Sequence, residues 1–296
     1  MTMHRHTAPP YHRRGTAKRF MGRWKVGPWI VMCVVFLLTL AVFALFGNVI
    51  APHTPEEQDL LARLQPPAWI EGGDWSRVLG TDHLGRDLLS RLIVGARISL
   101  FIAVVSVIIS GTLGVTIGLI AGYFGGRFDA ILMRLADMQL AIPFILLAII
   151  IIGIFGPSLP NIIGVLVVTN WVAYARVIRS EVITIKERHF VEAARALGQN
   201  DGRILVLHIL PNAFNAILVV ATLDVGRMIF FESALSFLGL GLPPPVISWG
   251  GMLSDGKLYM ASAWWLATFP GIIISLAILS VNLLGDWLRD VLDPRA

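Results

Sequence analysis

The sequence predicts an all-α membrane protein with six transmembrane helices. Of its 296 residues, 56% are hydrophobic and only 15% are charged, and the mean hydropathy is +0.74. A soluble domain of this length needs a more polar surface, so we expect lipid around most of the chain. The apolar residues also fall into charge-free runs, and several of these reach the roughly 20 residues that a helix needs to cross a bilayer.

Five charge-free windows give six expected spans, because the window at 138–175 is too long for one helix. Two prolines in "GPSLPN" interrupt it and favour a tight turn between two helices. A cleaved signal peptide is the alternative for the first window, but the apolar run is too long and no clear cleavage site follows. The expected spans are residues 28–50, 97–122, 131–154, 160–181, 208–233 and 263–285.

The distribution of Lys and Arg predicts the orientation. With the N-terminus inside, the inner segments hold 17 of these residues and the outer segments 6, and Arg227 lies within a span. This bias follows the positive-inside rule, so we expect both termini in the cytoplasm. We attribute the net charge of +5 to this topology and expect no nucleic-acid partner. The expected divisions are a basic cytoplasmic tail (1–25), a first helix (26–51), an extracytoplasmic lobe (52–96), a core domain (97–285) and a cytoplasmic tail (286–296).

Two outer segments have distinct patterns. In the first, "GTDHLGRDLLSRLIVGARISL" predicts an interfacial helix capped by Thr81 or Asp82, with Leu84, Leu88 and Leu92 on one face. The second, residues 234–262, contains three consecutive prolines and five glycines, which oppose a regular helix through its middle. Such backbone near membrane depth must pack on protein or line a wet cavity. We interpret this loop as a gate, a docking surface or a rigid connector.

A polar stretch, "EAARALGQNDGRILVLHILPN" (192–212), separates the fourth and fifth spans. Residues 187–197 favour a helix. The small side chains of Ala193, Ala194 and Ala196 leave room for the close approach of a partner. The stretch is either an ordinary helical connection or a knob that fits a groove in a cytoplasmic partner and transmits its motion.

Residues after this helix predict its ending and the next span. Gly198 suits a left-handed C-terminal cap. Asn200 or Asp201 can cap a second helix that runs into the membrane, and Pro211 marks the entry of the fifth span. His208 is interpreted as an interfacial hydrogen-bonding residue rather than as a ligand or proton site.

The stretch resembles the EAA loop of binding-protein-dependent ABC importer permeases. Six residues match that pattern in register: Glu192, Ala193, Ala194, Gly198, Leu210 and Pro211. "HILPN" places His208 at a usually apolar position and is similar to the peptide-importer branch. From residue 78 onward the chain resembles the second permease subunit of dipeptide, oligopeptide and nickel importers, in blocks such as "GYFGGRFDAILMRLADMQLAIPFILLAI" and "FESALSFLGLGLPPPVISWGGML".

The resemblance implies a type I ABC importer transmembrane domain in a bacterial inner membrane. A homologous second permease would complete the pore, and two cytoplasmic ATPase domains would bind the EAA loops, here at about 186–207. An extracytoplasmic binding protein would deliver the cargo. Peptide is the expected cargo, and nickel or another small solute is the alternative. ATP and magnesium would belong to the ATPase partners, so we expect no cofactor in this chain.

No segment predicts catalysis or a metal site in this chain. "GMLSDGKL" (251–258) departs from the phosphate-binding loop at Leu258, where that motif needs a hydroxyl. Cys33 is the single cysteine, and no paired Cys and His spacing is present. An ion-coupled secondary transporter is the alternative from another class, but most of these have more spans. A sensor or assembly factor is a third class.

Charged residues inside the expected spans are candidates for a functional site, because charge at membrane depth is costly. Asp224 and Arg227 are three residues apart and can pair on one helix. Arg134 and Asp137 have the same spacing. We expect Asp224, Arg227 and Glu232 either to border the translocation path or to form structural ion pairs inside the bundle.

Overall fold

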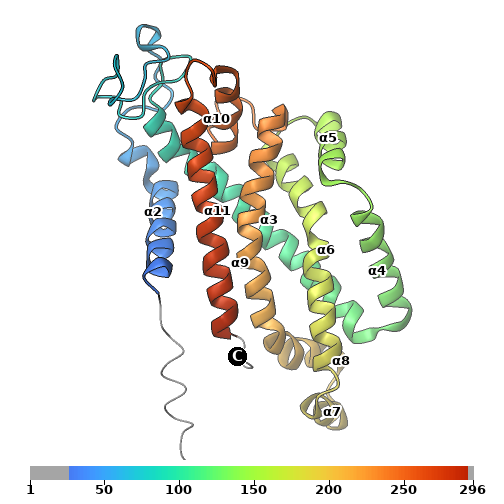
Figure 1. Ribbon diagram of the computed structural model, residues 1–296. Coiled ribbons are helices and arrows are strands. Elements are labelled where there is room, and N and C mark those ends of the chain that lie inside the picture. The colour runs from blue at the N-terminus through green and yellow to red at the C-terminus, as the bar shows by residue number, and fades with distance from the viewer. Residues whose placement is uncertain (1–26, 293–296) are drawn as a thin grey trace, which may run out of the picture.

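The computed structural model describes residues 27–292, and these form an α-helical bundle (Figure 1). The predicted basic tail, residues 1–25, lies outside the described residues. Within 27–292 there is no β-sheet, only an isolated bridge between Thr81 and Asp87. The helices are α2 (Pro28–Ile50), α3 (Leu88–Phe124), α4 (Gly126–Leu140), α5 (Phe144–Phe155), α6 (Leu159–Ile185), α7 (His189–Ala196), α8 (Asp201–Ile204), α9 (Leu210–Leu235), α10 (Trp249–Gly256) and α11 (Trp265–Leu292).

Five stretches of this bundle are long and apolar enough to cross a membrane: α2, α3, α6, Asp201–Leu240 and α11. A bent pair, α4 with α5, provides a sixth candidate. The prediction of an all-α, multi-pass membrane protein is therefore confirmed. The first span matches its expected limits, and the turn after Phe155 separates α5 from α6, with the Ser158 hydroxyl accepting from the Asn161 backbone N–H.

The expected single helix at 131–154 is wrong. α4 and α5 meet at an angle of 85°. Pro143 precedes the first residue of α5, and the residue before a proline is pushed away from helical backbone angles. The helix therefore stops at Leu140 and restarts in a new direction at Phe144.

The expected interfacial helix and the second span form one 37-residue helix, α3. Its cap is Asp87, whose side chain accepts the Ser90 N–H at 2.8 Å, so the predicted caps are wrong. Residues 81–86 instead form a turn, because Asp82 Oδ1 accepts the N–H groups of residues 84 and 86 at 2.8 and 3.0 Å. Leu88 and Leu92 do face the core, each 2% exposed.

A row of glycines lets α3 and α6 approach each other. A Cβ added at Gly114 would lie 2.3 Å from the Trp171 carbonyl oxygen, and one at Gly118 would lie 2.6 Å from that of Ala175. Small residues at such spacing allow close backbone contact between membrane helices, where van der Waals packing replaces the hydrophobic effect as the driving force. This contact makes α3 and α6 the central pair of the bundle.

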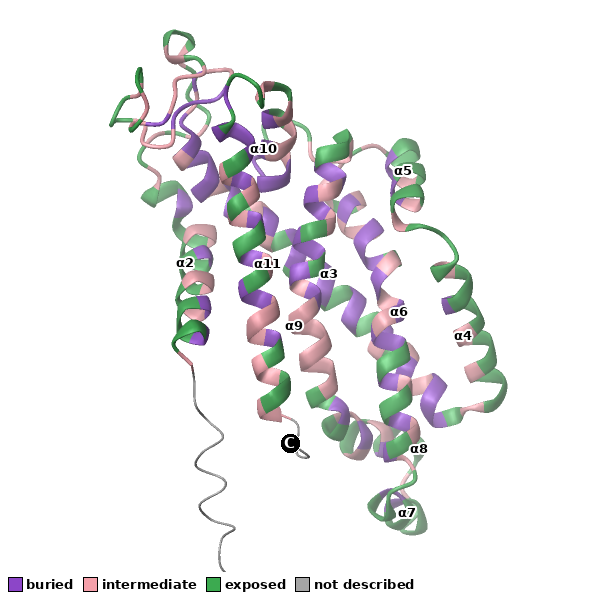
Figure 2. Ribbon diagram, viewed as in Figure 1, coloured by how far each residue is buried: buried purple, intermediate pink, exposed green. Residues whose placement is uncertain are grey.

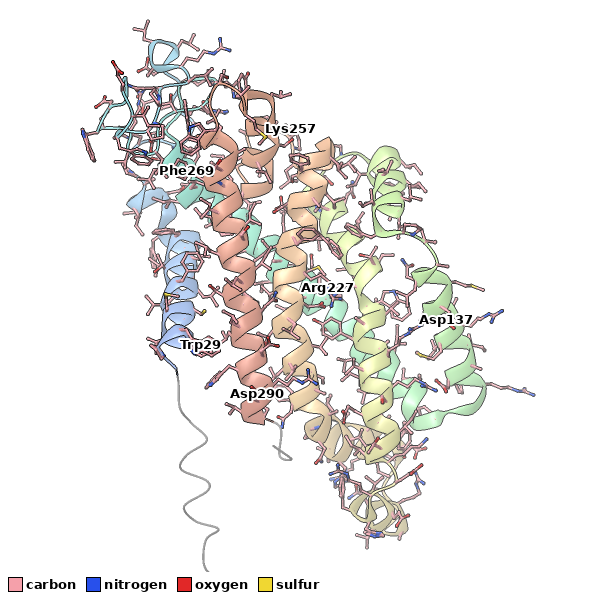
Figure 3. The ribbon with its side chains drawn as sticks, in the orientation of Figure 1. Trp29, Asp137, Arg227, Lys257, Phe269 and Asp290 are labelled. Carbon is pink, nitrogen blue, oxygen red and sulfur yellow. The ribbon has the colours of Figure 1, made fainter. Side chains whose placement is uncertain are left out.

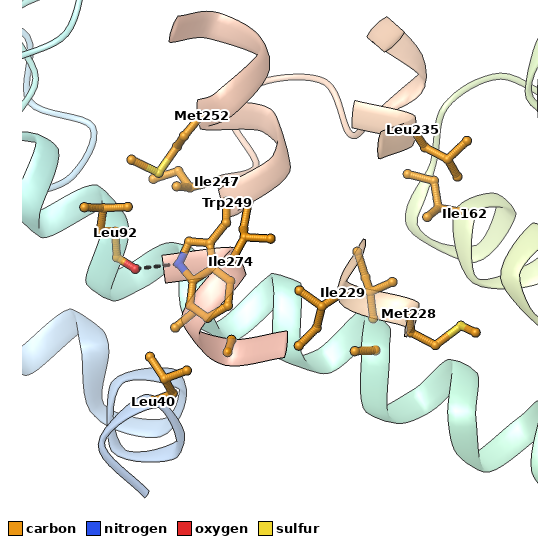
Figure 4. Packing of buried hydrophobic residues seen from close by; sticks show 14 of the residues in the cluster. Leu40, Leu92, Ile162, Met228, Ile229, Leu235, Ile247, Trp249, Met252 and Ile274 are labelled. Carbon is orange, nitrogen blue, oxygen red and sulfur yellow. Dashed lines mark hydrogen bonds between the residues drawn. The ribbon is translucent and has the colours of Figure 1, made fainter. Parts of the chain in front are cut away.

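Trp249 fixes α10 against the bundle (Figure 4). Its side chain is fully buried, and its indole N–H donates to the Leu92 carbonyl oxygen at 2.9 Å. Its backbone N–H donates to Ser99 Oγ at 3.0 Å. The backbone around the three prolines, residues 241–248, is irregular as expected, and α10 begins only after them. The segment 251–258 is part of this helix and the turn after it.

The bundle has two different ends. An irregular lobe, residues 51–87, and α10 lie at one end, which we call the lobe end. α7 and both termini of the described chain lie at the other, which we call the loop end (Figure 1). α11 continues to Leu292, so the expected tail from residue 286 begins as helix. Buried residues concentrate on α3 and α6, whereas α2, α4 and α5 are largely exposed (Figure 2).

Candidate coupling loop and intramembrane charge cluster

The coupling loop, residues 186–207, places α7 against the loop end of the bundle. Val191 and Ala194 are 0% and 4% exposed and belong to an apolar cluster with Ile185, Ile204 and Ile209. Burial of this face fixes α7 to the ends of α6 and α9, because apolar area removed from water is the main stabilising contribution. The expectation that all three alanines face a partner is therefore wrong for Ala194.

The opposite face of α7 is free for a partner. Glu192, Ala193 and Ala196 are exposed, and Leu197 is 82% exposed. The Glu192 carboxylate lies 3.2 Å from His189 Nδ1 on the same helix. This face presents small side chains and one protruding leucine to the surroundings.

Gly198 ends α7 in the predicted left-handed conformation, with φ of +79°. Its N–H donates to the Arg195 carbonyl oxygen at 3.0 Å, and the Gln199 N–H donates to that of Ala194 at 3.2 Å. Nothing lies within 4 Å of an added Cβ, so the backbone angle alone selects glycine here. Asn200 then caps α8, accepting the Arg203 N–H at 2.8 Å. Both cap predictions are confirmed.

Tyr123 anchors the coupling loop to the end of α3. Its hydroxyl donates to Asp201 Oδ1 at 2.5 Å and accepts from Arg195 Nη2 at 3.3 Å. The hydrogen bond from Arg195 to the Tyr123 hydroxyl raises the pKa of Arg195. Lys186 Nζ adds a bond of 3.0 Å to the Gly122 carbonyl oxygen. Tyr123 was not among the residues predicted from the sequence, although a tyrosine at the end of a long apolar helix is a recognisable signal.

The entry of α9 departs from a regular helix. Residues Leu205–Ile209 form a π-helical turn, in which the Leu210 N–H donates to the Leu205 carbonyl oxygen. Pro211 has no N–H and stands in the first turn of α9, so the widened turn precedes it. His208 Nε2 lies 2.9 Å from Gln199 Oε1, which is the hydrogen-bonding role that the sequence predicts. The chain stays helical through this widened turn, so one helical stretch runs from Asp201 to Leu240.

A charge cluster lies halfway along the bundle, where Figure 3 labels Arg227. Arg227 Nη1 lies 3.3 Å from Asp224 Oδ1, which confirms the predicted pair, and 3.4 Å from Asn170 Oδ1 on α6. The Asn170 amide donates to the other oxygen of Asp224. Asp224 is buried, whereas the Arg227 side chain is 48% exposed. A guanidinium exposed at this depth must face water or protein, because lipid contact is too costly.

Glu232 does not join this cluster. It is fully buried, and its Oε1 accepts from Ser236 Oγ at 2.9 Å and Ser248 Oγ at 3.0 Å. These bonds hold the end of α9 to the segment that caps α10. Of the three candidates for the path, Arg227 alone has an exposed side chain, so the structure favours the structural interpretation for Glu232.

Two ion pairs tie α4 to α6. Asp137 lies 2.5 Å from Arg176, and Asp129 accepts from Arg179 Nη2 at 2.6 Å. The expected pairing of Asp137 with Arg134 is wrong, because α6 offers a closer partner across the helix interface. These pairs support the loop end of the bent α4–α5 segment.

A bundle of long apolar helices, with a short helix anchored across one end and a charged cluster halfway along it, defines a multi-pass membrane protein. Residues 114–296 match the family described as the binding-protein-dependent transport system inner membrane component. Residues 17–67 match the N-terminal transmembrane domain of oligopeptide transport permease C. The chain belongs to the family of inner membrane components of binding-protein-dependent transport systems.

Several curated relatives share this family. The chain is 44% identical over 262 residues to the di/tripeptide transport system permease protein DppC of Pseudomonas aeruginosa, covering 88% of this chain and 86% of that protein. It is also 44% identical over 278 residues to the dipeptide transport system permease protein DppC of Escherichia coli K12, covering 94% and 93%. The chain is thus a permease subunit of an ABC importer.

Solved structures support the fold. A chain of the MetNI methionine ABC transporter in an inward-facing conformation aligns with a TM-score of 0.56 at 18% identity, covering 68% of this chain and 96% of that one. A second crystal form of that transporter aligns with a TM-score of 0.52. The prediction of a type I ABC importer transmembrane domain is confirmed.

Proposed function

We propose that this chain forms half of the translocation pore of an ATP-driven importer of short peptides. The relatives named above are dipeptide and di/tripeptide permeases, which supports peptide cargo over nickel. The second half of the pore is a homologous permease, and an extracytoplasmic binding protein delivers the peptide. The positive-inside bias supports a cytoplasmic loop end, with both termini inside the cell.

The anchoring of α7 supports its role as the contact for a cytoplasmic ATPase. The inner face of α7 is buried against α6 and α9, and Tyr123 joins the segment after α7 to α3. A force on the exposed face of α7 therefore moves the ends of α3, α6 and α9 with it. Because α8 leads without a break into α9, the motion reaches the centre of the membrane. ATP and magnesium bind the ATPase partners, and the coupling residues in this chain are Glu192, Ala193, Gly198, Leu210 and Pro211.

Arg227 is the residue of this chain that we place on the translocation path. Asp224 and Asn170 hold its guanidinium from the buried side, and almost half of its side chain remains open. A peptide passing this point meets a positioned positive group with unused N–H donors. Asp224 is then a positioning residue, and Glu232 supports the bundle beside α10.

Transport by the assembled importer tests this function. The chain is reconstituted in proteoliposomes with its co-purified permease, ATPase and binding-protein partners, and uptake of a labelled dipeptide is measured. The proposal predicts uptake that requires ATP, that persists without ion gradients and that excess nickel leaves unchanged. Uptake that follows an imposed proton or sodium gradient without ATP would support the secondary-transporter alternative. Uptake of nickel without uptake of peptide would show that the cargo is nickel.

A further inference from the structure

A pocket of about 450 Å³ opens at the lobe end, away from the coupling loop and the charge cluster. Its walls come from the lobe, from the turn before α3 and from the segment that leads into α10. This volume lies within the usual range for small-molecule sites, about 300–1,000 Å³. The pocket has no role in the function proposed above.

One wall of the pocket carries an excess of positive charge. Arg86 Nε and Arg91 Nε lie 2.6 and 3.6 Å from the same carboxylate oxygen of Asp82. The other oxygen of Asp82 already accepts two backbone N–H groups. Two guanidinium groups therefore share one occupied carboxylate, although each could bind a carboxylate with two parallel hydrogen bonds.

Arg91 is the more buried of the two arginines. Its side chain is only 7% exposed. Within residues 27–292, the Arg91 guanidinium makes one hydrogen bond, a long contact of 3.4 Å from Nη1 to the Pro55 carbonyl oxygen. A buried charge with so few partners is costly unless another group satisfies it. His83 Nδ1, on the same wall, is also buried and without a hydrogen bond in the described part of the chain.

The other walls have complementary chemistry. Asp255 on α10 and Glu56 on the lobe line the pocket, and neither forms an ion pair with the described residues. Four apolar side chains also line the pocket: Leu242, Val246, Ile247 and Met252. The pocket thus presents N–H donors, free carboxylates and an apolar surface around one space.

We propose that this pocket binds short peptides with free ends. The peptide carboxylate binds to Arg86 and Arg91, the terminal ammonium binds to Asp255 and Glu56, and an apolar side chain contacts the segment 242–252. A zwitterion complements both the two arginines that share one carboxylate and the two carboxylates that form no ion pair, whereas an anion or a cation alone complements one of these groups. The inference rests on the proposed peptide function and adds a second peptide site, at the lobe end.

Blocked peptides test this site directly. The complete importer assembly, in nanodiscs and without the binding protein, is titrated with Ala-Leu, N-acetyl-Ala-Leu and Ala-Leu amide by isothermal calorimetry. We expect Ala-Leu to bind and each blocked form to bind at least tenfold more weakly. Asp255→Asn should weaken the binding of Ala-Leu about tenfold. N-acetylation should then weaken binding less than it does in the wild type, because the ammonium that it removes has already lost one of its two partners.

Matched variants separate this pocket from other sites. Asp290→Asn changes an exposed aspartate near the opposite end of α11 and should leave binding unchanged (Figure 3). Asp255 is exposed and makes no side-chain hydrogen bond within residues 27–292, so its substitution breaks no hydrogen bond in the network around Arg91.

The outcomes distinguish this inference from the proposed function. Equal binding of free and N-acetylated Ala-Leu, or unchanged binding by Asp255→Asn, would overturn the pocket site. Absence of binding in an assembly that still imports dipeptides would overturn the inference and leave the proposed function intact. Binding with the predicted pattern in an assembly that imports no peptide would support the pocket and contradict the proposed function.

Discussion

The hydroxyl of Tyr123 lies 2.5 Å from Oδ1 of Asp201 and joins the last turn of α3 to the first turn of α8. The same hydroxyl accepts a hydrogen bond from Arg195 on α7. One side chain therefore connects three helices at the loop end. This contact makes the coupling loop part of the membrane bundle rather than a flexible connection between two spans.

We predict that Tyr123→Phe weakens coupling. Removing the hydroxyl leaves Asp201 and Arg195 without their shared partner, and we expect a loss of about 1–2 kcal/mol in the free energy of unfolding. ATP-driven uptake should fall several-fold while the ATPase rate changes less. Tyr259→Phe is the control, because the Tyr259 hydroxyl makes no hydrogen bond within residues 27–292. Equal loss in both variants would contradict this role of Tyr123.

We predict that Gly118→Ala destabilises the bundle. The new methyl group would lie 2.6 Å from a backbone oxygen of α6, so α3 and α6 must separate, at a cost of about 1–3 kcal/mol. Gly164→Ala on α6 is the control, because nothing lies within 4 Å of its added Cβ. Thermal unfolding in detergent measures both. A similar midpoint for the two variants would show that the helices are not in close contact at Gly118.

We predict that Asp224→Asn reduces transport through its effect on Arg227. The substitution removes the ion pair with the guanidinium and the charge that strengthens the hydrogen bond from Asn170, and it should cost about 1–3 kcal/mol of stability. The double variant Asp224→Asn with Arg227→Gln should recover part of that stability, since no unpaired charge remains. Unchanged uptake by correctly assembled Asp224→Asn would remove this pair from the path.

We predict a pH-dependent stabilisation of the lobe by Asp59. Arg77 Nη2 lies 3.0 Å from its carboxylate, and this hydrogen bond holds the pKa of Asp59 below its ordinary value of 3.8. The stabilisation is therefore present above that value and is lost as the pH falls through the lowered pKa. Hydrogen exchange of the lobe should show wild type better protected than Asp59→Asn at pH 6. A difference that stays unchanged while the pH is lowered until Asp59 is protonated would argue against the ion pair as its source.

The sequence predicts most of the helices because lipid imposes long apolar runs. The limits of α2 and the cap at Gly198 follow from local rules, so both are correct. The bend between α4 and α5 was missed because the apolar run continues through Pro143, and hydropathy carries no information on direction. Asp87 was missed as a cap because Asp82, in the same motif, suits that role equally well by residue type.

The site was predicted only where its residues are neighbours in the chain. The pairing of Asp224 with Arg227 depends on a spacing of three residues and could be inferred. The contacts of Tyr123 with Asp201, and of Asn170 with Asp224, join residues far apart in sequence. They depend on how α3, α6 and α9 pack, which no local pattern specifies. Tertiary contacts likewise decide that Asp137 pairs with Arg176.

In the mechanism that we propose, the turn at Gly198 transmits ATPase motion to α9. Gly198→Val tests it most directly, because a β-branched residue cannot easily adopt a φ of +79° although the space beside it is empty. ATP hydrolysis and peptide uptake are measured together in the same proteoliposomes. The account predicts uptake reduced at least tenfold per ATP hydrolysed, with the ATPase subunits still bound. Full uptake per ATP from the assembled variant would contradict it.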